Sequence, residues 1–454
     1  MGTRIHGGLA VGALLAAAVV GVLALPGSAR AQVFSPARSL SSTAEGYQEP
    51  QVSALGALVH VAWVDLATGN GDVYYRRGTD GGAGFGPARN LSEDGVTPEE
   101  GAHSVRVLAQ GERVYLTWVE GGLRFRASHD RGATFGPVLE LTGWPEGGPR
   151  LAASGDSVYM AWYRSLEDEV GDIWFVRGVD GGRVFADIED LDETRRNYGG
   201  VELAASGEHV YVLWDDGGSN DGADLFFRRS TDRGITFEPL VRLTDSDAES
   251  DQQQLAVQGS TVYVLWAECP YSECQVLLRR SMDAGATFGE PVRVSPVSEL
   301  IDGPRLVARD SRVFVAWAAP PGDSYEADVY LTLSVDGGTR FAAPLNVSRT
   351  PGDSRDVRLV PAGAGVRLAW AEGDDAREVY TRATRGYGLS LGPAENLSRT
   401  PRVDSGRPSL ASSRCGSQVH VAWLEGDDSG YSVLYRRASL PFSSGYCLLL
   451  PEPR

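Results

Sequence analysis

The sequence predicts an all-β fold, a β-propeller of four-stranded antiparallel blades, because three features recur along the chain. Eight tryptophans return at intervals of 44 to 55 residues, and each ends a short alternating run such as VHVAW at 59–63. A segment close to Ser-x-Asp-x-Gly-x-Thr-Phe follows most of these runs, and the chain ends carry complementary pieces of one repeat. Alternation predicts strands rather than helices, and a period of about fifty residues predicts one blade per repeat.

In chain order, the first 31 residues are predicted to form a secretory signal peptide. Gly7–Leu25 is apolar and rich in small residues, and Ala29-Arg30-Ala31 supplies an A-x-A cleavage signal. The alternative is an uncleaved anchor helix, since the apolar stretch is close to the minimum for crossing a bilayer. After cleavage, residues 32–454 form a single propeller domain that is secreted, periplasmic or on the cell surface, without membrane insertion.

One complete repeat shows the four expected strands. Residues 149–155 form the innermost strand, 158–162 the strand that ends in the tryptophan, 172–177 the third and 185–191 the outermost. The eight tryptophans that mark the second strands are Trp63, Trp118, Trp162, Trp214, Trp266, Trp317, Trp370 and Trp423.

The repeated turn segment lies between the third and fourth strands. Its best copies are SHDRGATF at 128–135, STDRGITF at 230–237, SMDAGATF at 281–288 and SVDGGTRF at 334–341. An Asp that accepts hydrogen bonds from nearby backbone N–H groups, followed by a Gly free to adopt a positive φ, suits a hairpin turn. The terminal Phe is expected to anchor the next strand.

These segments resemble the Asp box of the sialidase-like β-propellers, also called the bacterial neuraminidase repeat. The resemblance covers nearly the whole chain after the leader. In that family the box is a structural turn remote from the ligand site, so the resemblance implies the fold and leaves the function open.

The two chain ends predict how the ring closes. Phe34–Ser41 matches Phe85–Ser92, which is an outermost strand, whereas the last repeat lacks both the turn segment and its own outermost strand. The N-terminal strand is therefore expected to complete the last blade and give eight blades, with seven as the alternative. The sialidase catalytic propellers have six, so the predicted count departs from those enzymes.

Composition limits the partners. The formal net charge is −18 and none of the basic residues is Lys, which excludes lysine Schiff-base chemistry and argues against nucleic acid as a partner. Four cysteines in an exported chain favour two disulfides, Cys269–Cys274 and Cys415–Cys447, the second stapling the C-terminal tail. A metal site is the alternative interpretation of these cysteines.

A polar column in the innermost strands is the best candidate for a ligand site. Twelve residues before successive tryptophans stand Gln51, Arg106, Arg150, Glu202, Gln254, Arg305 and Arg358, with Ser409 matching after an insertion of two residues. The candidate ligand-binding residues are Arg106, Arg150, Glu202, Arg305 and Arg358. They stand early in the innermost strands and are therefore expected near one end of the central channel, which we call the top face. Guanidinium groups at this end would suit a carboxylate ligand. Sialidases hold the carboxylate of their sugar with three arginines. The alternative is that these arginines pair with loop acids and tie blades together.

Acidic loops on the same face offer a weaker candidate. Asp215, Asp221 and Asp224 are the best candidates for a calcium site, because a hard cation takes several loop oxygens. Their spacing does not match an EF-hand loop, and charge solvated by water is the alternative interpretation.

The catalytic residues are not assigned. A sialidase would add a Tyr nucleophile assisted by a Glu, and an Asp as acid/base. Tyr198 and Glu202 are near in sequence only, and the family's Phe-Arg-Ile-Pro segment is missing. The sequence therefore favours an exported propeller that binds a glycan or another extracellular ligand on its top face. An exo-α-sialidase or related glycoside hydrolase is the alternative.

Overall fold

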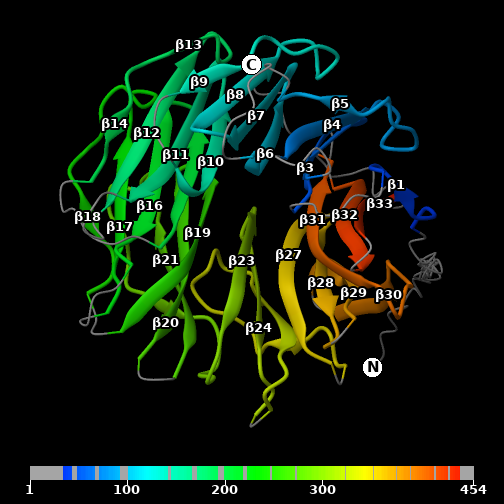
Figure 1. Ribbon diagram of the computed structural model, residues 1–454. Helices are drawn as coiled ribbons and strands as arrows, with labels where there is room; N and C mark the ends of the chain where they lie inside the picture. The colour runs from blue at the N-terminus through cyan, green and yellow to red at the C-terminus, as the bar shows by residue number, and fades with distance from the viewer. Residues whose placement is uncertain are drawn as a thin grey trace, which may run out of the picture.

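The structure is a computed structural model. Its eight antiparallel sheets follow one another in a ring around a common axis (Figure 1). The residues it describes are 34–42, 49–66, 71–92, 101–141, 145–165, 171–192, 199–217, 222–245, 248–270, 273–322, 324–350, 352–374, 376–388, 390–413, 416–427 and 430–439. The predicted leader lies outside them.

The first four blades follow the predicted order of strands from the axis outward. Blade 1 comprises β2 (Gln51–Leu55), β3 (Leu58–Asp65), β4 (Asp72–Gly78) and β5 (Arg89–Asn90). Blade 2 comprises β6 (His103–Gln110), β7 (Arg113–Val119), β8 (Leu123–Ser128) and β9 (Leu139–Leu141). Blade 3 comprises β10 (Glu146–Ser154), β11 (Ser157–Ser165), β12 (Gly171–Val179), and an outermost strand in two pieces, β13 (Val184–Phe185) and β14 (Glu189–Asp190). Blade 4 comprises β15 (Val201–Ser206), β16 (His209–Asp215), β17 (Leu225–Ser230) and β18 (Val241–Arg242).

The remaining blades repeat this plan, and the last takes a strand from the N-terminal end. Blade 5 comprises β19 (Glu249–Gln258), β20 (Thr261–Cys269), β21 (Gln275–Ser281) and β22 (Val292–Arg293). Blade 6 comprises β23 (Asp302–Arg309), β24 (Arg312–Ala319), β25 (Asp328–Ser334) and β26 (Leu345–Asn346). Blade 7 comprises β27 (Ser354–Ala362), β28 (Gly365–Glu372), β29 (Glu378–Arg385) and β30 (Ser390–Asn396). Blade 8 comprises β31 (Asp404–Ser412), β32 (Gln418–Asp427), β33 (Gly430–Ser439) and β1 (Arg38–Ser39).

The ring closes as the sequence predicts. Strand β1 pairs antiparallel with β33, with Arg38 opposite Tyr435 and Ser39 opposite Leu434. The fold is an eight-bladed β-propeller, and the seven-bladed alternative is wrong. The seventh repeat matches the turn segment poorly and lacks its Asp, but it also forms a full blade. Its turn is η1 (Gly386–Gly388), the one helical segment in the part of the chain that the structure describes.

Each blade buries its tryptophan against a neighbour. All eight side chains of the tryptophan column are at most 2% exposed. The apolar clusters draw residues from two successive blades. The cluster around Trp118, for example, also contains Val64 and Tyr75 of blade 1. The core is therefore a set of inter-blade layers rather than one central mass.

The repeated turn has the predicted hydrogen bonds. In blade 2, Asp130 accepts from the backbone N–H of Thr134 at 2.8 Å and from its hydroxyl at 2.6 Å. The Ser128 hydroxyl accepts from the N–H of Gly132 at 2.8 Å and donates to Asp130 at 2.7 Å. These bonds, led by that from the Thr134 hydroxyl, hold the pKa of Asp130 at about 2.

The Phe that ends each turn joins the blades. Phe341 of blade 6 packs against an apolar cluster that contains Leu278 of blade 5. In blades 1 to 5 the Phe packs edge-on against an aromatic ring of the preceding blade, with ring centroids 4.9–5.0 Å apart. These pairs are Phe85–Tyr435, Phe135–Tyr75, Phe185–Phe125, Phe237–Phe175 and Phe288–Phe227. The first pair joins blade 1 to blade 8, so the same contact operates across the point of closure. Edge-to-face pairs add about 0.5–1.5 kcal/mol beyond their buried area.

Of the two predicted disulfides, one lies within the described residues. Cys269 and Cys274 are bonded to each other, so the metal interpretation of this pair is wrong. Cys415, Cys447 and the C-terminal tail lie outside the described residues. No helix in the described part of the chain is long and apolar enough to cross a membrane.

The turn of blade 2 closely approaches blade 1 at Gly132, and substitution of this glycine tests how tightly the two blades pack. Gly132 has φ +79°, and an added Cβ would lie 2.1 Å from the Tyr75 hydroxyl, which hydrogen-bonds His60 at 2.6 Å. Gly111, in the same blade, has φ +58° and open space around it. Substitution to Ala places a side chain in the left-handed region at both positions, which costs about 1–2 kcal/mol. Gly132→Ala should lose about 1–3 kcal/mol more, because it also overpacks the interface between blades.

Thermal and urea unfolding of Gly132→Ala, with Gly111→Ala as the matched control, measure this difference. Equal losses in the two variants would show that the turn does not set the spacing between the blades.

Candidate functional site

The polar column occupies one register position in every blade. Each member lies directly opposite the residue that precedes the tryptophan. The pairs are Gln51–Ala62, Arg106–Thr117, Arg150–Ala161, Glu202–Leu213, Gln254–Leu265, Arg305–Ala316, Arg358–Ala369 and Ser409–Ala422. The alignment predicted from the sequence, including the insertion after Ser409, is therefore confirmed as a structural register.

A bulge precedes the column in six of the innermost strands. The register shifts immediately before Arg106, Arg150, Gln254, Arg305, Arg358 and Ser409. Four residues other than glycine have positive φ two positions before a column member. These are Ser104 at 56°, Gln252 at 52°, Asp356 at 56° and Arg407 at 51°. Bulges re-aim side chains and are frequent beside functional sites, and left-handed non-glycine residues persist where the surrounding structure enforces them.

Three column members of successive blades are joined to one another. Arg150 of β10 donates to Glu202 of β15, with Nε–Oε1 3.2 Å and Nη2–Oε1 3.1 Å. Gln254 of β19 donates to the same oxygen at 3.4 Å. The Glu202 side chain is 18% exposed and that of Arg150 35%, so this pair is only partly open to water.

A second ion pair involves a residue outside the column. Arg358 Nη2 donates to Glu49 Oε1 at 2.7 Å. Glu49 precedes β2 of blade 1, so the contact spans blade 8. The loop-acid interpretation made from sequence thus applies to Arg358, and Glu49 is a site residue that sequence reasoning missed.

The other two arginines have no carboxylate partner among the described residues. Arg106 Nη1 donates to the carbonyl of Val105 at 3.0 Å, and Arg305 Nη1 donates to the carbonyl of Pro304 at 3.0 Å. Each guanidinium therefore folds back on its own strand and leaves most of its donors uncommitted to an acid.

Burial and mutual repulsion act on these two side chains. Burial lowers the pKa of Arg305 to about 10, with Arg358 as the next cause, while Glu202 acts in the opposite direction. Burial also lowers the pKa of Arg106, and Arg150 adds to that effect. A bound anion would relieve both causes, because an opposite charge favours the protonated guanidinium.

A cavity of about 510 Å³ lies against the column on the innermost strands of blades 3 to 6. Its lining includes Arg150, Glu202, Gln254 and Arg305, together with Asp215 and Asp251. Blades 3 and 6, which supply Arg150 and Arg305, thus lie on either side of blades 4 and 5, which supply Glu202, Asp215 and Asp251. The cavity is a half-open hollow in which a ligand could meet guanidinium and carboxyl groups at once.

The two aspartates of this cavity, Asp215 and Asp251, differ in their hydrogen-bond partners. Asp215 accepts from the N–H of Gly199 at 3.0 Å and from Gln253 Nε2 at 2.8 Å, and burial raises its pKa. Asp251 has a buried oxygen, Oδ1, without a hydrogen-bond partner in the described part of the chain. Burial, followed by the charges of Glu249 and Asp215, raises the pKa of Asp251 to about 6.

Two of the three residues considered for calcium lie within the described part of the chain, and their side chains have different surroundings. Asp215 faces the cavity, whereas Asp224 accepts from Thr244 at 2.9 Å and forms an ion pair with Arg242 of the outermost strand. Asp221 lies outside the described residues, as does Tyr198. No group of three or more His, Cys, Asp or Glu side chains suited to a metal occurs among the residues that are described.

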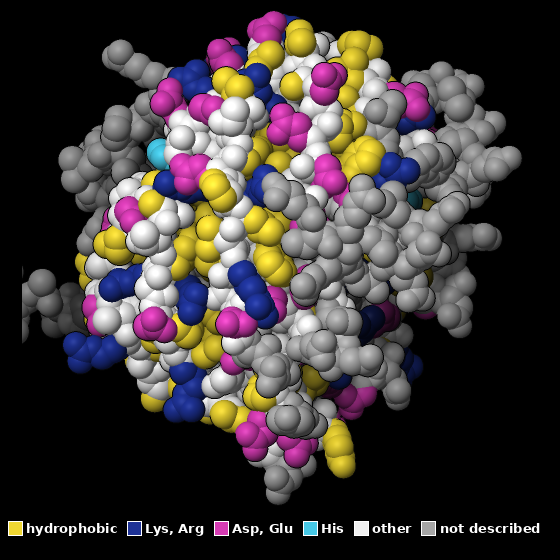
Figure 2. Space-filling view, turned by 90° about the vertical axis from the view of Figure 1, so that its left-hand side faces the viewer, with side chains coloured by type: hydrophobic (Ala, Val, Ile, Leu, Met, Phe, Trp, Pro, Cys, Tyr) yellow, Lys and Arg dark blue, Asp and Glu magenta, His cyan; other side chains and the backbone are white. Residues whose placement is uncertain are grey.

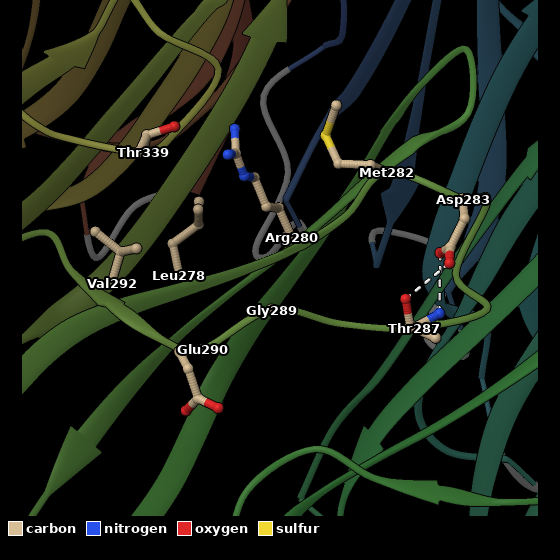
Figure 3. A pocket seen from close by; sticks show the side chains of 9 residues that line it. All are labelled: Leu278, Arg280, Met282, Asp283, Thr287, Gly289, Glu290, Val292 and Thr339. Carbon is tan, nitrogen blue, oxygen red and sulfur yellow. Dashed lines mark hydrogen bonds between the residues drawn. The ribbon is translucent and has the colours of Figure 1, made fainter.

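A second cavity lies at the outer edge of blade 5, against the repeated turn. Its volume is about 400 Å³. Figure 3 shows the side chains that line it, among them Leu278, Arg280, Met282 and Val292, with Thr339 from blade 6. Arg280 Nη1 donates to the carbonyl of Gly337 at 2.7 Å, so its guanidinium joins β21 of blade 5 to the turn of blade 6. Figure 2 shows acidic and basic side chains interspersed with apolar ones on this side of the ring, without a large patch of one charge. Neither this cavity nor the outer surface seen in Figure 2 gathers arginines as the column does.

Comparison with known proteins shows the fold alone. No protein-family model and no curated protein matches the chain. The polysaccharide lyase Uly1 has a TM-score of 0.51 and 10% identity over 89% of this chain and 91% of its own. A PL25 ulvan lyase has a TM-score of 0.50 and 11% identity over 72% of this chain and 90% of its own. A Trypanosoma rangeli sialidase in complex with sialic acid has a TM-score of 0.38 and 11% identity, over 66% of this chain and 55% of its own.

The raised pKa of Asp251 gives a pH dependence of stability. Its folded-state pKa is about 6 and its ordinary value 3.8, so between these values the folded state holds a proton that the unfolded state has released. Stability should therefore fall as pH rises from about 4 through 6. Asp251→Asn removes this loss, so its Tm should exceed that of the parent at pH 7.5 and match it below pH 4.

Differential scanning calorimetry across this range checks the prediction. Asp245→Asn is the control for the loss of one charge, because Asp245 is 85% exposed. A constant difference between Asp251→Asn and the parent at every pH would contradict the assignment.

Proposed function

We propose that this chain is an exported member of the sialidase-like Asp-box propellers that binds an acidic glycan, or another anionic extracellular ligand, on its arginine column. The observation that carries the proposal is the pair Arg106 and Arg305, which are half-buried and have no carboxylate partner in the described structure. A guanidinium presents a planar fork of donors that fits a carboxylate. Reduced exposure to water strengthens such contacts.

The charge of the column supports an anionic ligand. Four arginines face two carboxylates, those of Glu49 and Glu202, which leaves a formal excess of two positive charges. The whole chain carries −18. The positive excess belongs to the guanidinium groups themselves, because Asp215, Asp251 and Asp302 also line the adjoining cavity. An anion would therefore bind by direct contact with Arg106 or Arg305 rather than through a broad positive field.

The choice of a glycan rests on weaker support. Two solved structures that share the fold are named as polysaccharide lyases, and the family resemblance points to sugar acids. The proposed setting is extracellular or periplasmic, which the Cys269–Cys274 disulfide fits, because such bonds persist in oxidising compartments. Calcium bound by Asp215, Asp221 and Asp224 is not needed for this function.

Loss of either uncommitted arginine should weaken ligand binding. Hydrogen bonds to charged groups contribute about 1.5–3 kcal/mol, so Arg106→Gln and Arg305→Gln should each raise the Kd for sodium glucuronate about 10- to 100-fold at the arginine that is replaced. Isothermal titration calorimetry or ligand-observed NMR with the purified protein measures this. Methyl glucoside, which lacks the carboxylate, should bind no better to the parent than to the variants.

The matched control is Arg340→Gln, which also removes one positive charge, from a side chain that is 89% exposed on a turn of blade 6. Unchanged binding of glucuronate by Arg106→Gln and Arg305→Gln, with their Tm retained, would rule out the column as the site.

One observation favours a glycoside hydrolase as the second candidate. Glycosidases use two carboxyl groups, one with a raised pKa that lets it donate a proton. Asp251 has a raised pKa and lies in the cavity with Asp215 and Arg305. A tyrosine nucleophile of the sialidase kind is missing from the described lining of that cavity, which is why binding ranks first.

A fluorogenic sialoside separates the two candidates. If the chain is an exo-α-sialidase, the parent releases the fluorophore at acidic to neutral pH, and Asp251→Asn reduces kcat at least 100-fold, as general acid catalysis contributes about that much. Absence of release between pH 4 and 7.5, with and without calcium, removes the sialidase candidate for this substrate and leaves binding.

A further inference from the structure

The column repeats itself after four blades. Read around the ring, blades 1 to 4 carry Gln, Arg, Arg and Glu, and blades 5 to 8 carry Gln, Arg, Arg and Ser. The innermost strands contact each other in this order and close from β31 to β2. In a ring of eight, positions four apart face each other across the axis. Arg106 is therefore opposite Arg305, and Arg150 is opposite Arg358.

The ion pairs follow the same two-fold order. The third blade of each half holds the arginine that has a carboxylate partner, Arg150 with Glu202 and Arg358 with Glu49. Ser409 replaces the glutamate in the second half, and its hydroxyl accepts from the N–H of Val52 at 3.1 Å. Glu49, three residues before Val52, supplies the carboxylate instead. A different residue thus restores the same charge arrangement.

The uncommitted arginines also correspond. Arg106 and Arg305 occupy the second blade of each half, and each donates to the carbonyl of the preceding residue at 3.0 Å. A register shift precedes each of them in its strand, with a positive φ two residues before it, at Ser104 and Gly303. The two side chains therefore have equivalent backbones and equivalent hydrogen bonds on opposite sides of the axis.

The electrostatic influences cross the ring. After burial, the pKa of Arg106 is lowered by Arg150 beside it and also by Arg358 from the other half. The pKa of Arg305 is lowered by Arg358 beside it and also by Arg150 from the other half. The four guanidinium groups therefore act on one another, and one acidic group would neutralise only one of the two excess charges.

We propose that the column is a two-fold anion site that binds two acidic groups of one ligand, one on Arg106 and one on Arg305. This rests on the proposed function and makes the preferred ligand an oligomer of acidic sugars rather than a single sugar acid. Each arginine alone binds one carboxylate weakly. A chain that reaches both gains from the second contact, because that contact is made at the high effective concentration set by the linkage.

Titration with galacturonic acid and with oligogalacturonates of increasing length tests this inference. The monomer should bind with two equivalents per chain. Once an oligomer is long enough to reach both arginines, it should bind with one equivalent and a Kd lower by about 100-fold or more. Fully methyl-esterified oligomers of the same lengths are the matched control and should not bind, because they lack the carboxylates.

Variants separate the two halves of the site. Arg106→Gln and Arg305→Gln should each reduce the monomer to one equivalent and remove the gain with length, and the double variant should bind neither ligand. Arg340→Gln should behave as the parent.

The inference and the proposed function fail in different ways. One equivalent of monomer, a gain of less than threefold with length, or loss of both equivalents in either single variant overturns the two-fold site and leaves an anion site of one arginine. Absence of binding of every uronate, esterified or not, overturns the proposed function and the inference with it.

Discussion

The register between the two inner strands of each blade is the constraint on which the rest of the molecule depends. A buried tryptophan fixes the second strand in the layer between blades, and the residue before it faces a column member of the innermost strand. Side chains alternate between the faces of a strand, so a slip of one residue would move every arginine of the column into the apolar layer. Burying an unpaired guanidinium there costs far more than the strain at the bulges. The core therefore specifies where the polar side chains of the site lie.

The column in turn carries an unbalanced charge that the fold alone does not explain. Two arginine–carboxylate pairs would suffice to tie blades 3 to 4 and 7 to 1. Arg106 and Arg305 add positive charge beside those pairs, and burial and repulsion both lower their pKa values. Residues that lower the stability of the folded state are expected at binding sites, where contact with the ligand offsets the loss of stability. The two arginines without a carboxylate partner among the described residues, rather than any likeness to known proteins, make the column the candidate site.

The sequence was sufficient for the fold and for the column because both depend on a repeat. The tryptophans and turn segments recur at one spacing, and Ser409 could be aligned because its strand contains the same elements. Glu49 and Asp251 could not be identified in this way. Glu49 reaches Arg358 from a segment 309 residues away in sequence, and Asp251 ends the acidic segment 245–251, which resembles the other acidic loops of the sequence. Its raised pKa depends on burial among residues of blades 4 and 5, which no local pattern encodes. The partners of Asp224, Thr244 and Arg242 near the blade edge, are likewise not indicated by any local pattern.

The number of blades decides what the repeated arginines can do. Neighbouring arginines at positions 2 and 3 of a four-blade pattern face their counterparts only if the pattern occurs twice in a closed ring. Seven blades would offset the two pairs, and six would leave no room for a second pattern. The eighth blade is completed by β1, which pairs with β33, and Glu49 of the segment that follows β1 lies beside Arg358. The N-terminal segment therefore completes the ring and also restores the charge that Ser409 lacks. Closure of the fold and two-fold order of the site are consequences of one pairing.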